Sequence, residues 1–195
     1  MLLRKPNNMS EIVKPAKGDL LISEPFLPDP NFERSVILIC EHNDEGSLGF
    51  VLNKPTGHEL SEVLEVSEVF RNDLYQGGPV QLDTLHYIHR ESNLLGNAAN
   101  IKEDIFWGGD FERLMSLLNT HQLQSEDIKF FLGYSGWSPG QLEEELKEDS
   151  WFVYKQTTSY DVFDSSAQDL WRKVLKNMGG KYRMFSNYPT DPRLN

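Results

Sequence analysis

Short apolar runs of strand length, rich in Leu, Ile and Val, dominate the hydrophobic pattern of this chain. The runs at 18–23, 35–41 and 48–52 are typical of strands, and the polar stretch 42–47 has the turn chemistry of an antiparallel hairpin. The other predicted strands are 74–76, 85–89, 104–107, 128–134 and 151–155. The pattern therefore predicts a sheet whose early part is a hairpin.

Apolar residues at helical spacing alternate with these strands and predict four helices. The first is short, and Asp110 caps the second. The third runs from Pro139 to about Lys147, and the fourth is capped near Ser165 and ends at Gly179. The inner faces comprise Leu60, Val63 and Leu64, then Phe111, Leu114, Met115 and Leu118, and finally Leu170, Trp171, Val174 and Leu175. This order indicates an α+β fold: a single compact domain on a mixed, largely antiparallel sheet with flanking helices.

The predicted domain spans 18–180. Before it, the Asn-rich and proline-interrupted residues 1–17 are expected to form a flexible lead-in. After it, the tail 181–195 is expected to dock in part, because it carries Tyr182 and Phe185.

The start of the third helix has the strongest local signal in the chain. Ser138 is placed to be the N-cap, Pro139 suits the first helical position, and Gln141 lies where a capping-box partner reaches back to the cap amide. Trp137 and Leu142 match the spacing of a hydrophobic staple. One short segment is thus expected to position an indole, a glutamine and several backbone amides together.

Composition indicates a soluble globular protein. The 195 residues are 38% hydrophobic and 25% charged, and no apolar run approaches the roughly 18 residues that would span a bilayer. The first residues have no apolar stretch typical of a signal peptide, so we expect a cytoplasmic protein without membrane association. The single cysteine, Cys40, lies in an apolar strand and is expected to be a buried, inert thiol.

The charge balance argues against direct nucleic-acid binding. The chain has 19 basic and 30 acidic residues and a net charge of -11, which repels a phosphate backbone. Any role in gene expression is therefore expected to run through a protein partner.

Four motifs, in order, resemble the AlgH/YqgE family of bacterial proteins. They are 25–32, then 41–42 with 49–55, then 77–80, and finally 133–145 with Trp151. The family-typical positions are Pro25, Asp29, Phe32, Asn53, Pro55, Gly77, Gly78, Pro79, Trp137, Gly140, Gln141, Leu142 and Trp151. Ser135 stands where the family would have alanine. The resemblance implies a compact α+β fold and a cytosolic bacterial protein from a largely uncharacterised family, some of whose members are called transcriptional regulators.

The sequence does not match familiar catalytic or metal-binding motifs. The stretch 133–137 is similar to a nucleophile elbow, but Trp137 replaces its last glycine and His121, the last histidine, precedes the serine. His86 and His89 are three apart on a predicted strand and so point to opposite faces. No Walker or dinucleotide-binding motif occurs. We therefore assign no catalytic residue, no metal and no cofactor.

A candidate binding surface remains, formed by polar and turn residues at loops and strand ends. It comprises Asp29, Asn53, Gln76, Gly77, Gly78, Pro79, Trp137 and Gln141. In the alternative, these polar side chains merely satisfy local backbone amides. The leading hypothesis is a non-enzymatic protein that binds an unknown protein or small-molecule partner, with an indirect regulatory effect and an oligomeric state that the sequence leaves open. The second hypothesis is an enzyme acting on a small metabolite, with Asp29 or Glu41 as general base.

Overall fold

The computed structural model describes residues 13–66, 70–90 and 95–189, in which ten strands form a single sheet. The strands are β1 (Leu20–Ser23), β2 (Val36–Asn43), β3 (Gly46–Val51), β4 (Pro55–Glu59), β5 (Asp73–Gln76), β6 (Val80–His89), β7 (Ala99–Lys102), β8 (Ile105–Trp107), β9 (Ile128–Trp137) and β10 (Trp151–Tyr154). Their order is β10-β1-β2-β3-β9-β6-β8-β7, while β5 pairs with β9 and β4 with β5. Within the described ranges every pairing is antiparallel except β5 with β9, which confirms the predicted mixed, largely antiparallel sheet.

In the described residues, four α-helices and three shorter helical turns flank the sheet. They are η1 (Leu60–Glu62), α1 (Phe111–Asn119), η2 (Ser125–Asp127), α2 (Gln141–Lys147), η3 (Tyr160–Asp164), α3 (Leu170–Met178) and α4 (Gly180–Phe185). In the described part of the chain, no helix has the length and apolar character needed to cross a membrane.

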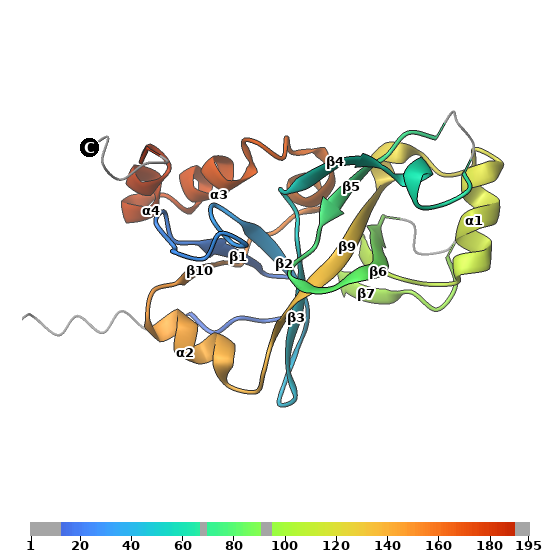
Figure 1. Cartoon of the computed structure of the whole chain (residues 1–195). Coiled ribbons are helices and arrows are strands. Elements are labelled where there is room, and N and C mark those ends of the chain that lie inside the picture. The colour runs from blue at the N-terminus through green and yellow to red at the C-terminus, as the bar shows by residue number, and fades with distance from the viewer. Residues whose placement is uncertain (1–12, 67–69, 91–94, 190–195) are drawn as a thin grey trace, which may run out of the picture.

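Strand β9 is the central element of the sheet (Figure 1). Its first half pairs with β5 on one edge and β6 on the other, and its last residues pair with β3, where Trp137 lies opposite Ser47. The end of β9 therefore lies beside the predicted hairpin of β2 and β3, which the structure confirms.

The sheet is covered on both faces where β1 and β2 lie. Leu38 and Cys40 pack in the core cluster that includes the apolar face of α3, whereas Ile37 and Ile39 pack in the cluster that includes α2. Figure 1 shows α3 and α4 on one side of these strands and α2 on the other. Because alternate residues enter different cores, the run is continuously apolar. Cys40 is buried, as predicted, and burial raises the pKa of its thiol.

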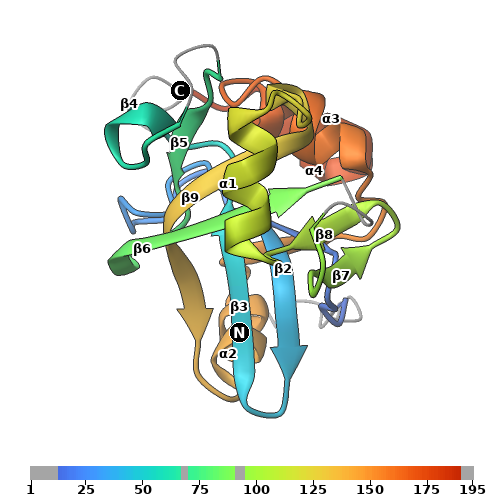
Figure 2. The ribbon, with the colours of Figure 1, turned by 90° about the vertical axis from the view of Figure 1, so that its right-hand side faces the viewer.

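A separate core lies at the other end of the sheet, under α1. Leu114 and Leu118 pack with Tyr87 of β6 and Phe130 of β9, and Figure 2 shows α1 lying over these strands. The predicted cap is confirmed, because the Asp110 side chain accepts a hydrogen bond from the Arg113 amide at 2.9 Å.

The first predicted helix is the largest departure in this region. The segment forms a three-residue 3-10 turn, η1, in which Leu60 is buried, and Val63, which follows the turn, is 47% exposed. Strands β4 and β7 were not predicted. Strand β4 has no alternation of apolar and polar residues, and its extended conformation is stabilised by backbone pairing with β5.

Two predicted helix caps are wrong. Helix α2 begins at Gln141 with Gly140 in a left-handed conformation at the cap, and the Ser138 hydroxyl makes no capping bond. The Gln141 side chain still reaches back as expected, accepting a hydrogen bond from the Ser138 amide at 3.0 Å. Ser165 is not the cap of α3, because a π-helical turn, η3, ends just before it and its hydroxyl bonds back to the Tyr160 carbonyl.

The chain after α3 forms α4 and packs against the sheet. Phe185 stacks on Phe152 with ring centroids 5.6 Å apart, and Tyr182 contacts the same ring. Residues 1–12 and 190–195, which include most of the predicted lead-in and the end of the tail, lie outside the described residues.

Candidate functional site

A single carboxylate collects hydrogen bonds from two tryptophans and a glutamine. Glu145 Oε2 accepts from Trp137 Nε1 at 2.9 Å and from Trp151 Nε1 at 2.7 Å. Glu145 Oε1 accepts from Gln141 Nε2 at 2.9 Å. Three donors therefore fix the position of this carboxylate.

The segment from β9 to β10 brings these residues together. Trp137 is the last residue of β9 and Trp151 the first of β10, and α2 connects the two strands. Gln141 and Glu145 are four residues apart on α2 and so lie on the same side of the helix. Leu142 packs with both indoles in one core cluster, which agrees with the predicted staple between Trp137 and Leu142.

A third aromatic ring comes from the proline-rich loop before β2. Phe32 stacks on Trp137 with centroids 6.4 Å apart and meets Trp151 edge-on at 5.4 Å. The two indoles are T-shaped at 6.0 Å. Such aromatic contacts stabilise one another by about 0.5–1.5 kcal/mol per pair beyond burial.

These groups border an open pocket of about 390 Å³, which we call the indole pocket. Its lining residues are Leu27, Asp29, Phe32, Pro79, Gly136, Trp137, Gln141, Glu145, Ser150 and Trp151. Within the described residues, the lining includes two carboxylates, Asp29 and Glu145, and no Lys, Arg or His. Asp29 also forms a turn, because its Oδ1 accepts from the Asn31 amide at 2.8 Å.

The structure brings together half of the predicted binding surface. Asp29, Pro79, Trp137 and Gln141 all line the indole pocket, although they come from three separate parts of the sequence. Gln76 is half-buried on β5 and does not line it.

Asn53 serves the backbone, as in the alternative interpretation of the sequence. Its Oδ1 accepts from the Val36 amide at 2.9 Å, and its Nδ2 donates to the Arg34 carbonyl at 2.8 Å. It lines a different pocket, beside Arg34 and Trp171. Asn53 therefore braces the loop before β2 and is not part of the indole pocket.

Gly77 and Gly78 are required for the close approach of two backbones. A Cβ on Gly77 would lie 2.3 Å from the Gly133 carbonyl oxygen, and one on Gly78 would lie 2.3 Å from the Tyr134 carbonyl. The Ser135 hydroxyl donates to the Gly77 carbonyl at 3.0 Å. These glycines hold the connection from β5 to β6 against β9, and thereby position Pro79 at the pocket.

Glu145 belongs to the site, although it was not among the predicted binding residues. Trp151 and Phe32 were recognised as family-typical positions but were not assigned to the surface. The available signal was the spacing of Gln141 and Glu145 on one side of a helix that follows Trp137 directly. By itself, a glutamate in the acidic run 143–145 is typical of the solvent-exposed face of a helix and does not indicate a binding site.

The other candidate catalytic and metal-binding residues of the described chain do not come together at one site. Ser135 is fully buried, and His86 and His89 contact different aromatic groups, with His86 near Phe50 and His89 near Phe106. Burial lowers the pKa of His86, which therefore stays neutral at pH 7. Across the described ranges, no group of three His, Cys, Asp or Glu side chains is arranged to hold a metal ion. Glu41 is exposed on β2.

The chain is similar to proteins of known family. A family model described as AlgH-like (DUF179) matches residues 20–183. A UPF0301 protein of Cytophaga hutchinsonii is 48% identical over 92% of this chain and 98% of its own length, and one of Chlorobaculum tepidum is 42% identical over 96% and 99%.

Solved structures agree with this assignment. The solution structure of the AlgH protein from Pseudomonas aeruginosa matches with a TM-score of 0.69 and 26% identity, over 95% of this chain and 98% of that one. A crystal structure of a Corynebacterium diphtheriae protein has a TM-score of 0.73 at 24% identity, over 90% and 93%, which supports the fold. The chain therefore belongs to the AlgH-like family.

Proposed function

We propose that this protein is a non-enzymatic binding protein whose indole pocket accepts a positively charged group. The observation that supports this most directly is the lining of that pocket, in which Asp29 and Glu145 lie beside three aromatic rings without a basic residue. Carboxylates attract a cation, and any aromatic ring face that the cation reaches adds a cation–π contribution of about 0.5–2 kcal/mol.

The hydrogen bonds to Glu145 prepare the site for such a ligand. Two indole N–H groups and one amide hold the carboxylate in place, so less side-chain entropy is lost on binding. The bonds also fix the orientation of both indole rings. The pocket is open and of modest size, which suits the end of a lysine or arginine side chain.

The cation can belong to a partner protein or to a small ammonium compound, since both share the same chemistry. A lysine or arginine on a partner protein is favoured by the acidity of the whole chain, whose net charge is -11 and which attracts basic partners. We propose that any regulatory effect, including one on transcription in a bacterial cytoplasm, is indirect and runs through such a partner.

The enzyme hypothesis has weaker support. Glu41 is exposed on β2 and lies outside the lining of the indole pocket. Asp29 does line the pocket, but one of its oxygens accepts a turn amide at 2.8 Å.

Replacing Asp29 with asparagine is expected to weaken the binding of a cation without disturbing the fold. Asparagine retains the side-chain oxygen that accepts the Asn31 amide, and it removes only the charge. At the protein surface, removing one nearby carboxylate charge is expected to weaken the free energy of cation binding by about 1 kcal/mol, which is about a fivefold increase in Kd. Isothermal titration calorimetry with N-acetyl-lysine methylamide, N-acetyl-arginine methylamide and tetramethylammonium would measure it.

The matched control is Glu148→Gln, which removes the same charge from an exposed residue just beyond α2 and outside the pocket. Equal weakening by both changes would mean that only the net charge matters, and would refute the proposed site. Preference for the two amino-acid amides over tetramethylammonium would favour a partner protein as the source of the cation.

A further inference from the structure

Lys129 is a largely buried lysine whose ammonium group contacts no carboxylate of the described residues. It lies on β9, 7% of its surface is exposed, and its Nζ lies 4.7 Å from the centroid of the Tyr75 ring. Among the described residues, no carboxylate forms an ion pair with Nζ and no acceptor bonds to it. Buried lysines usually have such partners, because burying an unpaired charge is costly.

This amine borders a second pocket, of about 220 Å³, which we call the lysine pocket. Tyr75 of β5 and Phe163 of η3 form aromatic walls, and Arg71 lies at the exposed rim. The pocket is distinct from the indole pocket, with which it shares no lining residue. A small molecule could therefore reach Lys129 without affecting the candidate site described above.

The wall that carries Phe163 is a π-helical turn, a rare conformation that is frequent at functional sites. On one side, Arg90 donates to Asp127 at 3.2 Å, to the Ser159 carbonyl at 3.4 Å and to Asp164, and its guanidinium stacks on the Phe163 ring at 4.8 Å. These bonds tie η3 to β6 and η2.

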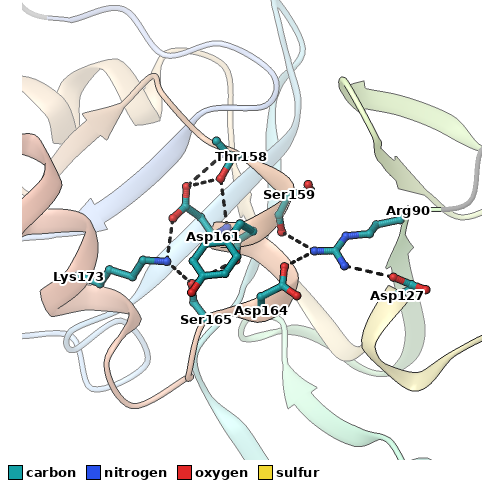
Figure 3. Close-up of polar contacts among 9 residues, drawn as sticks. Arg90, Asp127, Thr158, Ser159, Asp161, Asp164, Ser165 and Lys173 are labelled. Carbon is teal, nitrogen blue, oxygen red and sulfur yellow. Dashed lines mark hydrogen bonds and ion pairs between the residues drawn. The ribbon is translucent and has the colours of Figure 1, made fainter.

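Lys173 of α3 holds the same turn from the other side. Its Nζ lies 3.2 Å from Asp161 and 2.6 Å from the Ser165 hydroxyl, and the Asp161 carboxylate also accepts from Thr158. Figure 3 shows Arg90 and Lys173 approaching η3 from opposite sides. The wall of the lysine pocket is thus held in place by bonds to separate elements of the fold.

The environment favours the neutral, nucleophilic form of the amine. Burial lowers the pKa of Lys129 to about 8, although Asp164 and Asp73 oppose the shift. At pH 7 about a tenth of such an amine is free, against about one part in a few thousand for an ordinary lysine. Desolvated lysines of this kind are the ones that form imines with carbonyl compounds.

We propose that Lys129 is a reactive amine that condenses with a small aldehyde or α-oxo acid entering the lysine pocket. The nitrogen lone pair attacks the carbonyl carbon, the C–N bond forms as the C=O π bond opens, and one nitrogen proton passes to the oxygen by way of solvent to give a neutral carbinolamine. The carbinolamine hydroxyl then takes a proton from solvent and leaves as water, and the second nitrogen proton passes to solvent to give the imine. Arg71 at the rim supplies a cation for the carboxylate of an α-oxo acid.

The test uses the full chain, glyoxylate as the carbonyl probe, and cyanoborohydride, which delivers hydride to the imine carbon and fixes it as a secondary amine. Proteolysis and mass spectrometry give the rate of labelling at each lysine. At pH 7 we expect Lys129 to label at least about tenfold faster than Lys147, whose side chain is exposed, because burial lowers the pKa of Lys129 and so raises the fraction of its amine that is free. Equal rates, or labelling of Lys129 only in urea, would overturn the proposal.

Two variants make the test specific. Lys129→Met removes the amine and keeps an unbranched side chain of similar length. It should abolish labelling at position 129 and leave the labelling of other lysines unchanged. Arg71→Gln should slow labelling by glyoxylate but leave labelling by acetaldehyde unchanged; equal effects on both would refute the preference for α-oxo acids. The labelling rate of Lys129 should level off above about pH 8, in a site facing Asp73, Glu126, Asp164 and Arg71; a rate that does not level off there would contradict the proposal.

Discussion

Replacing Gly78 with alanine is expected to destabilise the protein by about 3 kcal/mol, since overpacking between fixed backbones forces the strands apart. The added Cβ would lie 2.3 Å from the Tyr134 carbonyl and 2.4 Å from the Ser135 amide nitrogen. Both atoms belong to the main chain of β9, the strand that joins the two parts of the sheet, so neither can move aside alone. Urea denaturation, followed by far-ultraviolet circular dichroism, would measure the free energy of unfolding.

Gly96→Ala is the matched control. A Cβ at Gly96 meets no heavy atom within 4 Å, and that residue does not adopt a positive φ. Its free energy of unfolding should stay within about 0.5 kcal/mol of the wild type. If Gly78→Ala were as stable as Gly96→Ala, the connection from β5 to β6 would not pack against β9 as closely as described.

Replacing Glu145 with alanine is expected to cost about 2–3 kcal/mol, because it leaves two buried indole donors without their acceptor. Trp137 and Trp151 are 6% and 3% exposed, so water replaces the lost carboxylate poorly. Glu145→Gln should cost about 1 kcal/mol, since its side-chain oxygen still accepts a hydrogen bond. The same urea denaturation measures both, and near-ultraviolet circular dichroism reports the ordering of the indoles.

Glu144→Ala provides the comparison for this change. Glu144 is an exposed neighbour on α2 whose ion pair is with the exposed Lys147, and such pairs contribute about 0.3–0.5 kcal/mol. Should Glu145→Ala cost no more than Glu144→Ala, the carboxylate would not be the element that organises the two indoles.

The strands of the early sheet were predictable because their chemistry is local. The hairpin at 42–47 has turn residues between two apolar runs, and Asp110 caps α1 through a contact three residues away. By contrast, β4 has no apolar pattern, and η3 is held in part by Arg90, whose partner Asp164 is 74 residues away in the sequence. Elements that are stabilised mainly by contacts between residues far apart in the sequence show little local hydrophobic pattern from which to predict them.

The part of the candidate site that was predicted from the sequence is the part in which residues from loops and strand ends meet at one pocket. Asp29, Pro79, Trp137 and Gln141 do meet at one pocket. Asn53 does not, because an asparagine at a strand end can equally satisfy backbone groups, as it does here. Glu145 was missed because its role requires the folded return of β10, which places Trp151 beside Trp137.

The four tryptophans allow the central claim to be tested in one spectrum. Two of them, Trp137 and Trp151, donate to Glu145, whereas Trp171 donates to the Ser23 carbonyl at 3.0 Å and Trp107 packs against Phe50. Indole N–H resonances can be followed by ¹H–¹⁵N correlation while N-acetyl-lysine methylamide is added, with the uncharged norleucine analogue as the control.

We predict saturable shifts of the Trp137 and Trp151 resonances with the lysine compound, little response to norleucine, and unmoved signals from Trp107 and Trp171. Equal shifts with both compounds, or no shift of the two pocket indoles at saturating ligand, would contradict cation binding at the indole pocket.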